Sequence, residues 1–183
     1  MRAQDAYISQ FRTMTDEVTA MFDDVPDELL YKRPGPSQNP IGWNYWHFLR
    51  IWDSGLHSII GGKDLKEQTW WRGGFAEQSG YDPAGLGGRG GGTGMGYTDA
   101  EVDAVQVPLE IIQAYHRQLL AETEEYLRSA DDEELNRVVP YWAGETTCAK
   151  MVEQAIRNCW MHYGEMRYAK GILGRPDASY PGR

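Results

Sequence analysis

Four stretches of this chain repeat apolar residues at the spacing of an α-helix, and this pattern limits the fold more than any other feature of the sequence. No run of alternating polar and apolar residues indicates a sheet of any size. A helix with one apolar face must bury that face against another element. We therefore predict an all-α protein, a four-helix bundle in a single domain over residues 1–183, with helices at about 5–24, 40–61, 108–129 and 147–173.

Local signals mark the ends of these helices. Asp5 is expected to be the N-cap of the first helix, and Asn39 that of the second, with Pro40 at the first helical position. The last helix is expected to end at Gly174, because glycine adopts the backbone conformation that closes a helix, and Pro176 follows it.

One connection, residues 63–106, is far longer than the roughly 2 to 8 residues that usually join bundle helices. Aromatic residues such as Trp70 and Phe75 come first in it, and the glycine-rich stretch 85–96 follows. We expect the aromatic side chains to pin the segment onto the bundle, while the glycines allow close backbone approach over the mouth of a pocket. The glycines also match G-x-G-x-x-G, but no strand precedes them and no helix follows, which excludes a dinucleotide site.

Charge and composition limit the kinds of partner that this chain is expected to bind. A formal charge of -9 disfavours a nucleic acid or an anionic membrane surface. No segment approaches the roughly 20 apolar residues that span a bilayer, and the first residues lack the apolar core of a signal peptide, so we expect a cytoplasmic protein. Cys148 and Cys159 fall in one predicted helix, too far apart to pair. We interpret them as buried thiols, with a reactive thiol as the alternative.

Histidines are the candidate ligands of a site, and the chain has 4 of them. Trp43, His47 and Arg50 share one face of the second predicted helix. His57 lies on another side of that helix and farther along it, so it cannot share a metal with His47 and is expected at the surface or in a second layer. His116 lies on the apolar stripe of the third helix, where a hydrogen-bonded core histidine is the commoner finding.

The fourth predicted helix carries a second polar group. Asn158, His162 and Glu165 recur at i, i+4 and i+7, so their side chains converge toward one point inside the bundle. Such a face suits a ligand site. A core histidine held by hydrogen bonds is the alternative interpretation of His162, as it is of His47.

Two segments resemble the DinB-like family. The phrase Asn-Pro-Ile-Gly-Trp-Asn-Tyr-Trp-His, within residues 39–53, is similar to the family's second helix, where a tryptophan or its equivalent precedes a metal-binding histidine. The phrase Asn-Cys-Trp-Met-His-Tyr-Gly-Glu, within residues 158–174, is similar to the fourth helix with its closing lysine-glycine turn. The resemblance covers nearly the whole chain and implies a bundle of DinB-like topology, with a long crossover between the second and third helices.

The resemblance also implies a metal site. Many members hold a divalent metal through three histidines, one on the second helix and two at i and i+4 on the fourth. The corresponding ligands here are His47, His162 and Asn158, which stands where the third histidine is expected. An amide oxygen is a weaker donor than imidazole toward zinc or nickel. Either Asn158, Glu165 or water completes a weaker site, or the cavity is metal-free and its polar residues bond one another or a ligand.

The superfamily includes thiol-dependent S-transferases and an isomerase. The resemblance therefore implies a metal-dependent transferase or isomerase that uses a low-molecular-weight thiol and a small-molecule substrate, which we expect Trp43 and Arg50 to contact. Arg50 would clamp a carboxylate; its alternative role is a salt bridge with Asp53 or with the fourth helix.

A different class of function stays open, namely a non-catalytic ligand-binding or stress-response bundle with a degenerate site, or a homodimer paired through exposed aromatic residues. The absence of Glu-x-x-His excludes ferritin-like di-iron chemistry, and nothing in the sequence supports a serine or cysteine hydrolase.

Overall fold

The computed structural model describes residues 2–142 and 144–174, and the long helices lie close to where the apolar pattern predicts them. The second of them continues past its α-helical part as a π-helix, η1. An all-α bundle is thus confirmed. The bounds are α1 Ala3–Met21, α3 Ile41–Asp53 with η1 Ser54–Ile60, α7 Leu109–Ser129 and α9 Cys148–Ile172.

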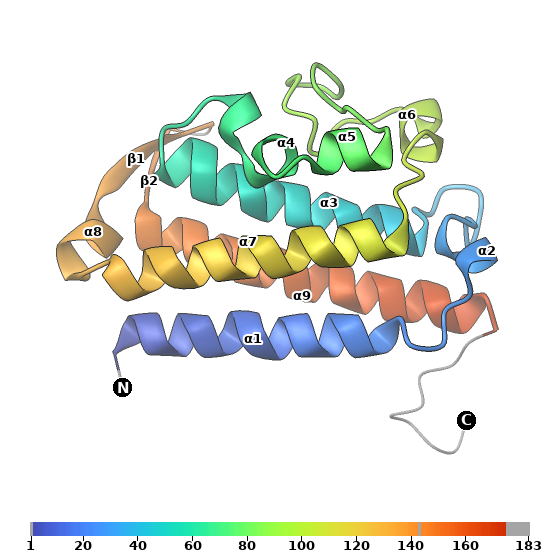
Figure 1. Ribbon diagram of the computed structural model, residues 1–183, viewed down its shortest axis with the longest axis horizontal. Coiled ribbons are helices and arrows are strands. Elements are labelled where there is room, and N and C mark those ends of the chain that lie inside the picture. The colour runs from blue at the N-terminus through green and yellow to red at the C-terminus, as the bar shows by residue number, and fades with distance from the viewer. Residues whose placement is uncertain (1, 143, 175–183) are drawn as a thin grey trace.

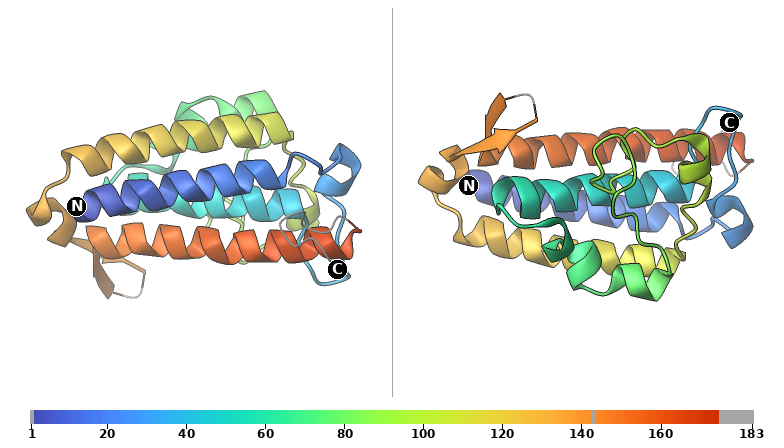
Figure 2. Two further views of the ribbon diagram at one scale, coloured as in Figure 1. Left: turned by 90° about the horizontal axis from the view of Figure 1, so that it is seen from below. Right: turned by 90° about the horizontal axis from the view of Figure 1, so that it is seen from above.

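The four helices pack in a ring, in which α1 contacts α7 and α9, and α3 also contacts α7 and α9 (Figures 1 and 2). Figure 1 shows that α1 and α9 run in one direction while α3 and α7 run in the other. Since α3 and α7 are parallel, the chain must return along the whole length of the bundle between them. This geometry explains the length of the predicted connection.

The returning segment, which we call the crossover, is built from short helices and an irregular glycine-rich part (Figure 2, right). Trp70 is fully buried and packs its ring against Tyr115 of α7, and Phe75 contacts the same tyrosine. The expectation that aromatic residues pin this segment is confirmed. The short helices are η2 Leu65–Glu67, α4 Thr69–Arg72, α5 Phe75–Ser79 and α6 Asp99–Asp103.

Some predicted helix ends shift by a few residues. Asp5 is the third residue of α1 and bonds back to the backbone of Arg2, which is the N-cap. Pro40, rather than Asn39, is the N-cap of α3. Both corrections have one cause, because an acidic or proline residue in a first turn suits neighbouring positions almost equally well. Gly174 follows α9 with a φ of 82°, as expected, and Pro176 lies outside the described residues.

A short hairpin and two small helices complete the described chain. The strands β1 Val138–Tyr141 and β2 Gly144–Thr147 pair antiparallel, with Val138 opposite Thr147. The sequence indicated no sheet of any size, and strands this short carry too few residues for an alternating pattern. The small helices are α2 Asp27–Leu30 and α8 Asp132–Asn136.

His116 is a core residue rather than a ligand. Its ring nitrogens lie 2.9 Å from the Thr15 hydroxyl of α1 and 2.9 Å from the Tyr45 hydroxyl of α3. Burial, followed by the charge of Arg117, lowers the pKa of His116 from 6.5 to about 3. The neutral ring therefore joins three helices of the bundle.

This buried histidine should make the fold sensitive to acid. As the pH falls from 6.5 toward 3, the unfolded chain gains a proton at His116 that the folded chain does not, so stability is lost on acidification. We expect His116→Gln to lower the stability at pH 7 by roughly 1–3 kcal/mol and to reduce the pH slope by about 1 kcal/mol per unit. Urea unfolding at pH 7, 6 and 5 measures both, and equal slopes in the two proteins would contradict the prediction.

Candidate functional site

His47 on α3 and His162 on α9 face each other across the bundle. Their ring centroids lie 4.8 Å apart and the ring planes are nearly perpendicular, at 87°. Each residue is 7% exposed. Two residues more than a hundred positions apart in sequence are therefore in contact because their helices are neighbours in the ring. Metal binding by this pair stays a prediction.

Both rings are held through the same nitrogen. The Nδ1 of His47 bonds the backbone carbonyl of Thr93 in the crossover, and the Nδ1 of His162 lies 2.7 Å from Oε2 of Glu165. A carbonyl and a carboxylate only accept hydrogen bonds, so each Nδ1 carries the proton and donates it. In the neutral form of either ring the lone pair is then on Nε2, the nitrogen for which the described residues provide no hydrogen bond.

The environment of His47 favours its neutral form. Burial, helped by the proximity of His162, lowers the pKa of His47 from 6.5 to about 4, while the Thr93 carbonyl works in the opposite direction. Neutral imidazole is the form that can bind a metal. Near neutral pH, His47 therefore presents a lone pair without first having to lose a proton.

Asn158 supplies a further observation. It precedes His162 by one turn of α9 and lies on the same face of that helix. Its Oδ1 is buried and has no hydrogen-bond partner among residues 2–142 and 144–174. A buried amide oxygen without a partner is costly, and a bound cation is one group that would satisfy it. By donor type, two imidazoles and one amide oxygen suit a weak metal site, and binding of a metal by this set stays a prediction.

No group of three or more histidine, cysteine or acidic side chains within the described chain is arranged to hold a metal. A third strong ligand is therefore lacking next to the histidine pair. Glu165, one of the alternatives for completing the site, is already engaged by His162.

Trp43 and the crossover both pack against His47. The Trp43 ring stacks on the imidazole with centroids 4.5 Å apart and planes 18° from parallel. Gly94 packs so closely that a Cβ at this position would lie 2.6 Å from Nδ1 of His47. The expected close backbone approach of the glycine-rich stretch is seen at Thr93 and Gly94, whereas its lying over the mouth of a pocket stays a prediction. Their contact is made by backbone atoms, which leave no signature in a sequence pattern.

A family model described as the DinB superfamily matches residues 10–166, which is most of the chain. The chain belongs to the DinB superfamily. The resemblance seen in the second and fourth helices is thereby confirmed.

A conserved protein from Enterococcus faecalis, known from a crystal structure, has a similar fold. The TM-score is 0.80, and the match covers 95% of this chain and 99% of that one. The two are 19% identical in sequence, a level at which the likeness shows the fold alone. The comparison with curated proteins gives no match. No helix in the described part of this DinB-superfamily chain is both long and apolar enough to cross a membrane.

Arg50 takes part in an internal network. It is fully buried, its guanidinium lies 4.5 Å from the centre of the Trp71 ring, and it forms the salt bridge with Asp53 that was the alternative role considered for it. Contact of Arg50 with a substrate stays a prediction. Its hydrogen-bond acceptors come from α3, α7 and the crossover: Asp53 at 2.7 Å, Tyr115 at 3.1 Å, Gln68 at 2.6 Å and the Gly92 carbonyl at 3.3 Å.

Asp53 is the partner around which this network is arranged. Its two carboxylate oxygens accept from the backbone amides of Thr69, at 3.0 Å, and Trp70, at 2.9 Å, which begin α4. The Tyr115 hydroxyl donates to it at 2.6 Å. The side chain is completely buried, so these bonds replace the water that a carboxylate would otherwise require.

Removing the charge of Asp53 should therefore strongly lower the free energy of unfolding. In Asp53→Asn the charge of Arg50 stays buried without its counterion, and breaking a buried pair from one side costs roughly 3–5 kcal/mol. We expect a loss of that size in urea unfolding. The matched control is Glu77→Gln, an exposed acid of the crossover, for which the change should stay within about 0.5 kcal/mol. A loss below about 1 kcal/mol for Asp53→Asn would contradict the role given to this residue.

His57 is not at the surface, contrary to one of the two expectations for it. It is 6% exposed, and its Nε2 lies 2.9 Å from the Thr69 hydroxyl and 2.8 Å from Oε2 of Glu122. The crossover folds over η1 and buries it. Helical periodicity alone could not show this, because the covering segment has no regular pattern.

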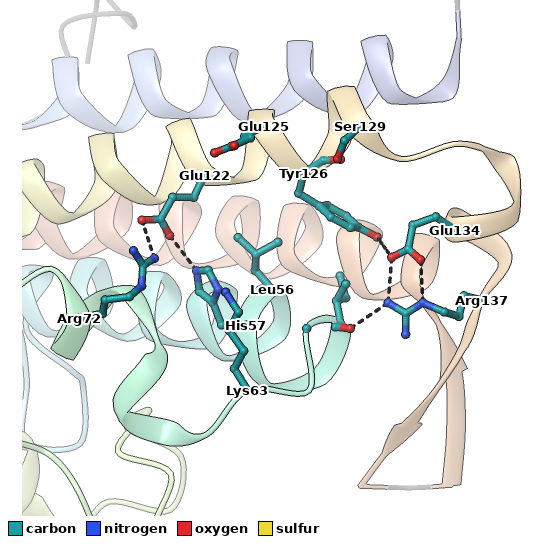
Figure 3. Close-up of a pocket in the computed structure, with 12 residues that line it drawn as sticks. Leu56, His57, Lys63, Arg72, Glu122, Glu125, Tyr126, Ser129, Glu134 and Arg137 are labelled. Atoms are coloured by element: carbon teal, nitrogen blue, oxygen red, sulfur yellow. Dashed lines mark hydrogen bonds and ion pairs between the residues drawn. The ribbon is translucent and has the colours of Figure 1, made fainter.

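A hollow of about 690 Å³ adjoins His57, well past His47 along the α3–η1 helix (Figure 3). Figure 3 shows several of its polar side chains in contact: Arg72 and His57 with Glu122, and Arg137 with Glu134. A smaller hollow of about 270 Å³ is lined by Glu165, Asn44 and Tyr168. Glu165, whose carboxylate bonds His162, is among the residues that line it, whereas neither His47 nor His162 is.

Proposed function

We propose that this chain is a metal-dependent, low-molecular-weight-thiol-dependent transferase or isomerase acting on a small molecule. The observation that carries the proposal is the facing pair of imidazoles. In both rings Nδ1 donates a hydrogen bond within the protein, so both Nε2 atoms are left to a ligand. Histidines that bind a metal are commonly oriented by such a bond from the other ring nitrogen. In this proposal His47, His162 and the orphan oxygen of Asn158 hold zinc or nickel.

A divalent metal bound there would lower the pKa of a thiol or a water and so supply a nucleophile at neutral pH. The protein's own residues prepare the site for it. Glu165 keeps the proton of His162 on Nδ1, and the Thr93 carbonyl does the same for His47. Trp43 covers one face of the His47 ring and excludes water from it. We propose the hollow beside Glu165 as the entry for thiol and substrate.

The second candidate is a metal-free bundle that binds a small ligand without catalysis. It is favoured by the asparagine where a third histidine is expected and by the lack of a strong three-ligand cluster within the described residues. In that case a ligand with a hydrogen-bond donor would occupy the Nε2 atoms and the Asn158 oxygen. Metal affinity separates the two candidates.

The affinity for metal should change in opposite directions when a histidine of the pair is removed and when Asn158 is replaced by histidine. We expect His47→Ala and His162→Ala each to weaken zinc or nickel binding by at least about tenfold, and Asn158→His to strengthen it by a similar factor, because it adds a third imidazole. Calorimetric titration of metal-free protein measures this. Gln10→His, which adds an exposed histidine on α1, is the control and should leave the strongest site unchanged. If Gln10→His tightens metal binding as much as Asn158→His does, the proposed site is contradicted.

Activity is tested separately, with a panel of low-molecular-weight thiols and electrophilic acceptors in the presence of zinc or nickel. Thiol consumption by the wild type that falls by at least about a hundredfold in His47→Ala, with the fold retained, would support the enzyme. Absence of bound metal together with no effect of His47→Ala on any thiol transfer would exclude it and leave the ligand-binding bundle.

A further inference from the structure

Three consecutive residues of the crossover, Gly92–Gly94, pass directly over the side chains of His47 and Arg50 on α3. We call them the glycine strap. The Gly92 carbonyl accepts from Nε of Arg50 at 3.3 Å, and the next carbonyl, that of Thr93, accepts from Nδ1 of His47. Since His47 and Arg50 are one turn apart on the same helix, two successive carbonyls follow the helix face and bond one side chain each.

Only glycine fits at the two ends of the strap. Gly94 has a φ of 92°, and a Cβ there would lie 2.6 Å from Nδ1 of His47 and 2.9 Å from the Trp43 ring. Gly92 has a φ of 58°, and its Cβ would lie 2.6 Å from the carbonyl oxygen of Pro83. Both the positive φ and the contacts exclude a side chain without a shift of the backbone.

The strap is held by backbone bonds on both sides. The Gly92 amide donates to the carbonyl of Leu86 at 3.3 Å, and the Gly94 carbonyl accepts from the amide of Tyr97 at 3.3 Å. Both glycines of the strap are buried. The carbonyl that reaches His47 is therefore fixed by the fold of the crossover itself and does not depend on a flexible side chain.

We propose that the glycine strap is a positioning element, which fixes His47 with its proton on Nδ1 and its Nε2 lone pair available beside His162 before any ligand arrives. A histidine without such a partner exchanges between its two tautomers and turns about its side-chain bonds. The strap removes both freedoms. Its effect on metal affinity rests on the proposed function, whereas its effect on the tautomer does not.

The tautomer is measured on the metal-free wild-type protein. Long-range proton–nitrogen NMR correlations distinguish a protonated Nδ1 from a protonated Nε2, and His47→Gln assigns the signals. We expect His47 as a single tautomer with the proton on Nδ1 at pH 7. A proton on Nε2, or an exchanging mixture, overturns the proposal, and this result does not require the Gly94 variant to fold.

A pair of glycine variants provides the second readout. Gly94→Ala places a methyl group against the ring and should displace the carbonyl, so we expect a mixed tautomer for His47 and zinc binding about 10–100-fold weaker. Gly88→Ala is the matched control, because a Cβ there meets nothing within 4 Å and the φ is not positive. It should leave both measurements unchanged.

The outcomes separate the two proposals. An unchanged tautomer in a folded Gly94→Ala protein overturns the positioning role of the strap. If the wild type binds no zinc, the metal-dependent function fails, while the tautomer of His47 still decides whether the strap positions the ring. If Gly94→Ala does not fold, the wild-type spectrum alone decides.

Discussion

The buried ion pair of Arg50 and Asp53 is the interaction on which the rest of the structure depends. Parallel packing of α3 and α7 forces the chain to return along the bundle, and this pair attaches the returning segment by polar bonds, beside the aromatic contacts of Trp70 and Phe75 with Tyr115. Asp53 accepts hydrogen bonds from the first two amides of α4, and Arg50 donates to the side-chain oxygen of Gln68 and to the Gly92 carbonyl. Two charges without access to water are stable here because nearly every donor and acceptor has a partner in the crossover or on α7.

The bundle itself could be predicted from the sequence, since helical periodicity depends only on which residues are apolar. The same reasoning placed His47 and His162 on faces that point inward, and the family resemblance paired their helices. It could not predict that His57 is buried, because the sequence of the crossover that covers His57 has no regular pattern of apolar residues. It placed Asp53 beside Arg50 as an ion pair without indicating that the pair would bind backbone amides sixteen and seventeen positions away.

In the candidate site, too, some features could be predicted from the sequence and others could not. The family resemblance singled out His47, His162 and Asn158, and the buried side-chain oxygen of Asn158 has no hydrogen-bond partner among the described residues. The groups that orient the rings differ in kind. Glu165 could be found by its spacing from His162, since three positions on a helix bring side chains together. Thr93 acts through its carbonyl, an atom that every residue possesses, so its identity says nothing about its role.

That contact has a consequence for how the site is encoded. Because the strap touches His47 through the main chain, the side chain at position 93 is free to vary, whereas the number of residues between the strap and its aromatic anchors is not. Inserting or deleting one residue there would bring a different carbonyl over the ring, or none. Apart from the glycines at positions 92 and 94, the length of this part of the chain matters more than the identity of its residues, so insertions and deletions among relatives will be more informative there than substitutions.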